Sequence, residues 1–224
     1  MATATFTSGT SDGSAYWKGP LASYPSATES GVQSDEAYFY VGQFKSIDNY
    51  FVYQAGVSFN TSSLGAGATI TGAALSLAGN WDSSNTDFDI EAFIYNWGSG
   101  ISTSSMRTAA QLNALPRVAY LPTSSFTVNA QATFTDLGLA PYIDKTGTTY
   151  IWLCSSRWRS GTAPTGDEYV TPWSANTGTA AYRPTLTVTY TTSAIKSVAG
   201  LATAGIKSVA GVPTANAKSV AGLA

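Results

Sequence analysis

The sequence predicts an all-β domain of the sandwich type, with an extended N-terminal arm before it and an extended repeat tail after it. About nine short apolar or alternating segments are separated by turn residues roughly every 8–15 positions. A single stretch has a helical pattern, which is too little for a fold that alternates strands with helices. Hydrophobic residues make up 44% of the 224 residues, enough to fill a core between two sheets.

The first half of the chain contains four predicted strands after an N-terminal segment. Residues 1–26 are mostly small and polar, and we expect an extended arm or a first edge strand there. Residues 50–59 alternate with a period of two, and one face of this strand carries Phe51, Tyr53, Ala55, Val57 and Phe59. The other predicted strands are 37–41, 69–79 and 88–97. The last has large apolar residues on both faces, which is typical of a central strand.

The second half contains the helical patch and the remaining strands. Residues 102–115 have a weak 3.6-residue pattern, with Ser104 or Ser105 as the expected N-cap and Pro116 just beyond the end. Further short strands are predicted at 117–121, 125–130, 132–138, 148–156, 168–173 and 183–190.

Two motifs frame the predicted domain. A strand ending in Phe59 is followed by a Ser-Ser-Leu-x-x-Gly-Ala loop (62–68), Ile70 and an Ala-x-Leu-x-Leu strand (73–77), and Arg-Pro-x-Leu-x-Val-x-Tyr follows much later (183–190). These motifs resemble those of the DNRLRE-type jelly-roll domains, which are similar to carbohydrate-binding modules attached to secreted proteins and enzymes. The resemblance covers about residues 35–191. It implies a jelly-roll β-sandwich, which we assign to residues 27–192.

Composition and charge argue against several classes of function. The net charge is −2 and charged residues are 11% of the chain, with no basic run, so we expect no binding to nucleic acid or to an anionic membrane surface. No apolar run is long enough for a transmembrane helix. The opening sequence MATATFTSGTSDGS has neither a basic nor an apolar region typical of a signal peptide, so synthesis in a cytoplasm without export is expected.

The sequence also predicts a protein without catalytic activity. It has no histidine, and its one cysteine, Cys154, lies in an apolar run that indicates a core position. The neighbouring carboxylates Asp89 with Glu91, and Asp167 with Glu168, are interpreted as solvated strand or loop residues and not as an acid–base pair. We expect no cofactor. A structural calcium ion among loop carboxylates is the one alternative.

Aromatic residues suggest a binding function instead. The chain has six tryptophans and thirteen tyrosines, and a sugar ring can pack on an aromatic ring. The candidate glycan-binding residues are those at predicted strand ends or in loops: Trp97, Trp158 and Trp173. The alternative is that these side chains pack in the core or at an interface. Arg157 and Arg159 flank Trp158 and are expected to stack or to form ion pairs.

The chain ends with one phrase repeated at a period of 11 residues. Lys-Ser-Val-Ala-Gly occurs at 196–200, 207–211 and 218–222. The glycines and Pro213 argue against a helix and favour short β-segments. The tail (193–224) is either a flexible linker or a set of units that dock on a partner by adding strands to a sheet edge. In the second case the partner-binding residues are Ile195, Lys196, Val198, Leu201, Ile206, Lys207, Val209, Val212, Lys218 and Val220.

Tandem tails of this kind resemble those of bacteriophage virion proteins. The resemblance covers residues 194–224 and implies an anchor that other copies or other virion subunits hold. The leading prediction is a non-enzymatic virion structural protein (a decoration, fibre or tail-associated protein) located on the virion. The alternatives are a carbohydrate-binding module or receptor-binding adhesin that contacts host-surface glycan, and a subunit of an extracellular filament.

Overall fold

The structure is a computed structural model that describes residues 1–33, 36–192, 208–209 and 212–213. Thirteen strands join in one antiparallel sheet, which confirms the predicted all-β class. They are β1 (Ala2–Thr7), β2 (Gly13–Pro20), β3 (Glu29–Gln33), β4 (Val41–Ser46), β5 (Asn49–Asn60), β6 (Ala68–Ser84), β7 (Asp89–Ile94), β8 (Arg117–Pro122), β9 (Gln131–Thr133), β10 (Thr135–Asp136), β11 (Thr148–Ser155), β12 (Asp167–Pro172) and β13 (Thr185–Thr192).

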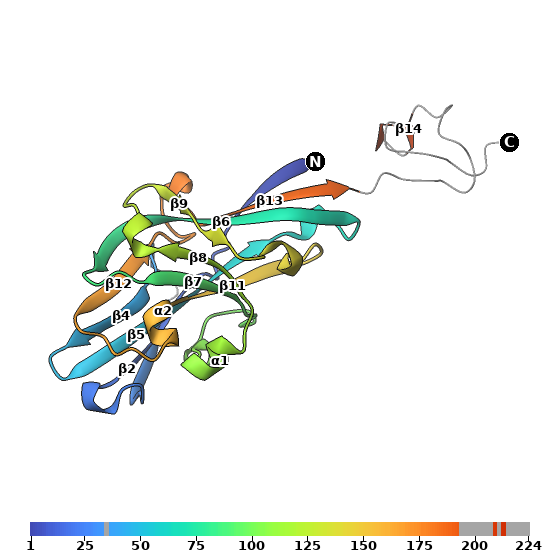
Figure 1. Cartoon of the computed structure of the whole chain (residues 1–224). Helices are drawn as coiled ribbons and strands as arrows, with labels where there is room; N and C mark the ends of the chain where they lie inside the picture. Colours follow the sequence, from blue (N-terminus) through green and yellow to red (C-terminus); the bar gives the residue numbers. More distant parts are fainter. Residues whose placement is uncertain (34–35, 193–207, 210–211, 214–224) are drawn as a thin grey trace.

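The strands follow the order β1-β13-β6-β12-β4-β5-β11-β7-β8-β10 (Figure 1). β2 pairs with β5 and β3, and β9 pairs with β6. Within residues 1–26, β1 is an edge strand beside β13, whereas β2 lies inside the sheet between β5 and β3. β7 lies between β11 and β8, so its prediction as a central strand is confirmed.

Three predicted elements differ from the structure. The predicted strand 37–41 is not a strand, because β4 begins only at Val41 and Tyr38 forms an isolated bridge with Trp173. Residues 123–125 form a 3₁₀ turn, η4 (Thr123–Ser125), and no strand covers 125–130. The predicted helix 102–115 is divided into a 3₁₀ turn, η3 (Thr103–Ser105), and a short helix, α1 (Ala109–Asn113). Thr108 caps α1 in place of Ser104 or Ser105, because its side chain and that of Gln111 satisfy each other's backbone N–H groups.

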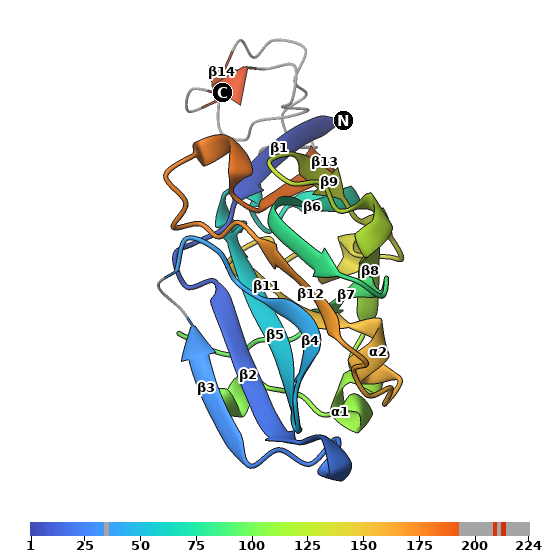
Figure 2. The same ribbon diagram turned by 90° about the vertical axis from the view of Figure 1, so that its left-hand side faces the viewer.

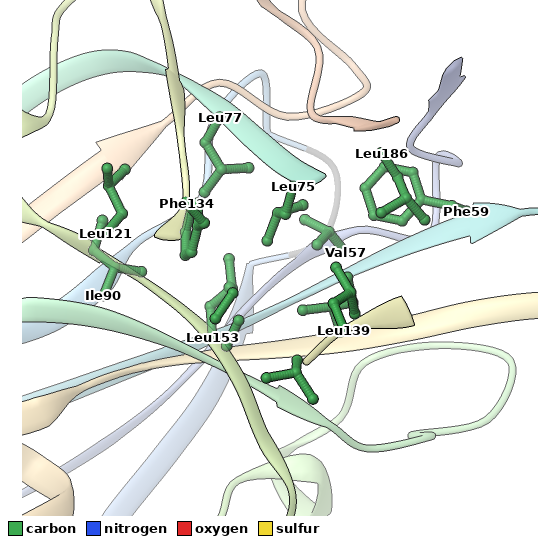
Figure 3. Packing of buried hydrophobic residues seen from close by; sticks show 14 of the residues in the cluster. Val57, Phe59, Leu75, Leu77, Ile90, Leu121, Phe134, Leu139, Leu153 and Leu186 are labelled. Carbon is green, nitrogen blue, oxygen red and sulfur yellow. The ribbon is translucent and has the colours of Figure 1, made fainter. Parts of the chain in front are cut away.

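β5 organises the sheet because three strands share its two edges. β2 pairs with the N-terminal part of β5 along one edge. On the other edge, β4 pairs with residues 49–53 and β11 pairs with residues 55–60. β4 and β11 therefore start from the same edge and diverge, one toward β12 and β6, the other toward β7 and β8. The space between these two layers holds the main core, which includes Val57, Phe59, Leu75, Leu77, Ile90, Leu153 and Leu186 (Figure 3).

A second apolar cluster lies on the opposite side of β2, β5, β11 and β7. Trp152 and Cys154 of β11 lie in it and are fully buried, which confirms the core position of the cysteine. The segment with η3 and α1 contributes Met106 and Leu112, and α2 (Ser156–Arg159) contributes Trp158. The Trp152 Nε1 donates a hydrogen bond to Gln54 Oε1 (2.7 Å), so this buried nitrogen is paired, whereas Tyr50 Oη and Trp97 Nε1 of the same cluster have no partner among the described residues.

Two buried carboxylates hold α2 in place, and their interpretation as solvated residues was wrong. Glu91 of β7 and Glu168 of β12 are both 0% exposed. Arg159 and Arg117 form ion pairs with Glu91, and Arg157 Nε lies 2.6 Å from Glu168 Oε2. Burial alone would raise the pKa of Glu168, but hydrogen bonds from Gln43, Thr165 and Arg157 outweigh it and lower this pKa.

Four residues of the repeat tail belong to the described part of the structure. β14 (Ser208–Val209) and β15 (Val212–Pro213) pair in antiparallel fashion, Ser208 with Pro213 and Val209 with Val212. The other predicted partner-binding residues lie outside the described residues: Ile195, Lys196, Val198, Leu201, Ile206, Lys207, Lys218 and Val220.

Asp12 connects the segment after β1 to the loop after β12. Its side chain is fully buried, and its Oδ2 accepts hydrogen bonds from Ser8 Oγ (3.1 Å) and from the Ala175 backbone N–H (2.7 Å). Within the described part of the chain its Oδ1 has no hydrogen-bond partner. Burial raises the pKa of Asp12 from 3.8 to about 6.

Asp12→Asn should therefore stabilise the fold at neutral pH but not in acid. The pKa of Asp12 in the folded protein lies above its ordinary value. The contribution of this carboxyl to the free energy of unfolding is therefore fully present below pH 3.8 and is lost as the pH rises through about 6. The loss is at most about 3 kcal/mol. Thermal unfolding at about pH 4 and about pH 7.5 measures it. An equal difference in Tm at both pH values would contradict this assignment.

Candidate functional site

The outer face of β6, β12, β4, β5 and β2 carries a continuous group of aromatic side chains. Figure 2 looks onto this side of the molecule, with α1 and α2 behind the strands. Directly paired residues share a face, and Tyr53 pairs with Tyr16 on one side and with Gly42 on the other, while Gly42 pairs with Tyr169. We use the term aromatic face for Tyr16, Tyr38, Tyr40, Phe44, Phe51, Tyr53, Trp81 and Tyr169.

The position of the divergence in β5 explains why this face is open. The predicted alternation is correct, since Phe51, Tyr53, Ala55, Val57 and Phe59 point to one side of the strand. Ala55 and the residues after it lie in the main core, because the β4 layer folds over them. Phe51 and Tyr53 lie before the divergence. There β4 pairs with β5 in the plane of the sheet and does not lie over these two side chains. The same side of one strand is therefore core in one half and surface in the other.

Trp81 is the most exposed ring of the aromatic face, at 62%. A β-bulge in β6 turns it outward: Thr171 pairs with Trp81 and Pro172 pairs with Gly79, so Asn80 is an extra residue. Strict alternation from Leu75 and Leu77 would have placed the indole on the core side. Its Nε1 donates a hydrogen bond to Ser83 Oγ (2.8 Å), which fixes the edge of the ring, and most of the side chain stays accessible to solvent.

A hollow of about 240 Å³ lies beside this indole. It is lined by Tyr38, Tyr40, Asn80, Trp81, Tyr169 and Thr171. The lining combines ring surface with hydroxyl and amide groups, and the Asn80 Nδ2 donates to Thr171 Oγ1 (3.3 Å). Burial raises the pKa of Tyr40 to about 12, so this hydroxyl keeps its proton at neutral pH. The hollow thus offers neutral hydrogen-bonding groups next to an exposed apolar ring.

The middle of the aromatic face consists of rings packed against each other. Phe44 and Phe51 stack with ring centres 4.5 Å apart and planes 3° apart. Tyr40 stacks on Tyr53 at 4.8 Å and 27°. Tyr169 lies 5.8 Å from both Tyr40 and Phe44. Rings that stack face to face cover each other's faces, whereas the indole of Trp81 is 62% exposed.

Two of the three tryptophans predicted as glycan contacts lie elsewhere, and the third lies beside the hollow. Trp97 and Trp158 belong to the second cluster and are 9% and 2% exposed, so neither presents a face to a ligand. The Trp158 Nε1 is bound to the Arg107 carbonyl (3.0 Å). Trp173 is half-buried, stacks on Tyr182 at 5.9 Å and pairs with Tyr38 at the rim of the hollow. The sequence reasoning missed Trp81, although the aromatic run at 37–41 was a usable signal for its neighbours.

Other classes of site find no support in the described residues. Within residues 1–33 and 36–192 and the two short strands of the tail, no group of three or more histidine, cysteine, aspartate or glutamate side chains is arranged to hold a metal ion. None of the described helices is long and apolar enough to cross a membrane. The chain matches no protein-family model and no curated protein.

Replacing Trp158 should lower the stability strongly, whereas replacing Trp81 should change it little. Trp158→Ala removes a buried side chain and should lower the free energy of unfolding by about 3–5 kcal/mol. Trp81→Ala removes an exposed ring and should change it by less than about 1 kcal/mol. Urea unfolding of both variants measures the two values. A large loss for Trp81→Ala would show that the indole supports the fold and is not a free surface.

Proposed function

We propose that the protein is a non-enzymatic carbohydrate-binding module of the jelly-roll type, and that the hollow beside Trp81 holds a sugar ring. The observation that carries the proposal is the 62% exposure of this indole next to a hollow lined by tyrosine hydroxyls, Asn80 and Thr171. A large exposed apolar ring has an unfavourable free energy in water, which the apolar face of a sugar can relieve.

The polar lining supports a sugar over a purely apolar ligand. Sugars carry hydroxyl groups around an apolar ring, and their recognition requires donors and acceptors placed around a stacking surface. Tyr38, Tyr40 and Tyr169 each contribute a hydroxyl, and Asn80 contributes an amide. None of the described side chains that line the hollow is charged. This chemistry suits hydroxyl groups better than it suits phosphate, carboxylate or ammonium groups.

Binding can be tested by native gel electrophoresis in gels that contain soluble xylan, β-glucan, mannan or galactan. The wild-type chain should be retarded by at least one of these polymers, and Trp81→Ala should lose the retardation, with an affinity loss of roughly tenfold or more. Tyr142→Ala is the matched control, since Tyr142 is 43% exposed but lies on the 3₁₀ turn η5 (Ala140–Tyr142), outside the aromatic face. Equal retardation of the wild type and Trp81→Ala would refute the proposal.

The tail supports a second, compatible role as an assembly anchor. Its threefold repeat at a period of 11 residues favours docking on a repetitive partner, as in a virion or an extracellular filament. An extended unit of this length spans at most about 36–40 Å, so the docking sites should repeat no further apart than that. We propose that the module is displayed on such an assembly, with a bacteriophage virion as the preferred case, where it would act as a decoration, fibre or receptor-binding protein.

Deleting residues 194–224 should separate the two roles. The truncated chain should keep the Tm and the polysaccharide retardation of the full chain, because the described core and the aromatic face end before residue 193. It should no longer cosediment with particles from cells that produce the complete assembly. Normal incorporation of the truncated chain would refute the anchoring role and leave the binding role intact.

A further inference from the structure

At the end opposite Trp81, the aromatic face ends with Tyr16, whose ring is inclined toward the edge of the sheet. Tyr16 of β2 pairs directly with Gly31 of β3, the edge strand. A Cβ atom at Gly31 would lie only 2.4–2.6 Å from Cε1, Cζ and Oη of Tyr16, so the ring occupies the space above this glycine. The tyrosine therefore leans across the edge strand, and a residue with a side chain at position 31 would push it away.

The ring angles support this arrangement. The plane of Tyr16 is tilted by 43° from Phe51 and by 49° from Tyr53, whereas the planes of Phe44, Phe51 and Tyr53 differ by 3–12°. Tyr16 is thus not part of the stack that Phe44, Phe51 and Tyr53 form, and it is only partly buried. The aromatic face therefore has a ring inclined over the edge strand at one end and the exposed indole at the other. Between them lie the stacked rings and Tyr169, which is tilted by 54° from Phe44.

The distance between the two ends exceeds a single sugar ring. Trp81 lies on β6 and Tyr16 on β2, with β12, β4 and β5 between them. Four neighbouring strand spacings of about 4.8 Å correspond to about 19 Å. A ligand that contacts both ends must therefore be a chain of several sugars that crosses the strands.

The charges around the aromatic face indicate which chains fit. Lys18 and Glu29 form an ion pair with each other (2.9 Å), and the Lys18 Nζ lies 5.8 Å from the centre of the Phe51 ring. Asp167 pairs with Phe44 in the sheet and adds a negative charge at the margin. The lysine is neutralised by its partner, and the aspartate repels anionic polymers. Recognition by rings and hydroxyls alone favours an uncharged chain.

We infer that this surface binds an extended, uncharged polysaccharide chain, which runs across the strands from Trp81 to Tyr16. This inference rests on the proposed carbohydrate-binding function and specifies its ligand. Trp81 and its hollow form the primary contact, and Tyr16 forms a second contact that only a sufficiently long chain can reach.

Calorimetry with xylo-, cello- and manno-oligosaccharides of increasing length tests the inference. The affinity should rise with length until the chain spans both rings and then level off. Tyr16→Ala should weaken the longest oligomer by roughly tenfold, as expected for one lost aromatic contact, while the disaccharide is unaffected. Tyr16→Phe keeps the ring and should bind like the wild type. Gly31→Ala keeps Tyr16 in the sequence but should displace its ring, because the added methyl group takes the space that the ring occupies. This variant should therefore bind the oligomers as weakly as Tyr16→Ala does.

The outcomes separate this inference from the proposed function. If disaccharides bind as tightly as long oligomers and Tyr16→Ala changes nothing, the extended site is refuted and the Trp81 site stands. If no neutral oligomer of any length binds, both are refuted. Binding of alginate or polygalacturonate in preference to neutral polymers would refute the uncharged ligand. A dimer in sedimentation experiments that Trp81→Ala dissociates would assign the surface to a second copy of the chain and refute both.

Discussion

The division of one edge of β5 between β4 and β11 is the constraint on which the rest of this structure depends. Every buried backbone group of β5 needs a partner, and no single neighbour supplies partners along its whole length. β4 supplies them up to Tyr53 and β11 from Ala55 onward. The two neighbours must then separate, and the space between their layers has to be filled with apolar side chains. The outer side of the β4 layer cannot be covered by the β11 layer, so the core and the aromatic face are two sides of the same strands.

The separated layers are joined again by α2. Glu168 belongs to the β4–β12 layer and Glu91 to the β7–β8 layer, and Arg157 and Arg159 of α2 reach one each. Removing Arg157 would leave the buried charge of Glu168 without its ion-pair partner, which typically costs about 3–5 kcal/mol, whereas Glu91 would keep its ion pair with Arg117 if Arg159 were removed. An apolar contact of the same size could stabilise the fold equally well. The ion pairs add directional hydrogen bonds, which define the spacing of the two layers more strictly than apolar packing does.

Local alternation was enough to predict the fold class, because it depends on neighbours in the sequence. The strand at 50–59 was predicted with its correct face. Alternation could not show that the neighbouring strand changes from β4 to β11 between Tyr53 and Ala55, so that the first side chain lies on the aromatic face and the second in the core. Trp81 was missed for a related reason: the bulge at Asn80 reverses the pattern set by Leu75 and Leu77, and it is defined by pairing with Thr171 and Pro172, ninety positions away. Trp97 and Trp158 were chosen because they follow strands, a position that does not determine burial.

If the proposed function holds, the weak binding expected of a site built from rings and neutral hydroxyls would explain why the chain carries a repeat tail. An open surface of this kind excludes little water and has no buried ion pair with its ligand, so each copy alone should bind with modest affinity. Copies that are held together raise the effective concentration of the second and later contacts, and the combined affinity then exceeds that of one site by orders of magnitude. A polysaccharide presents the same unit many times and is suited to such binding. Display on a repetitive assembly and recognition of a repetitive ligand are therefore complementary, and the low charge of the chain would make the attachment insensitive to salt.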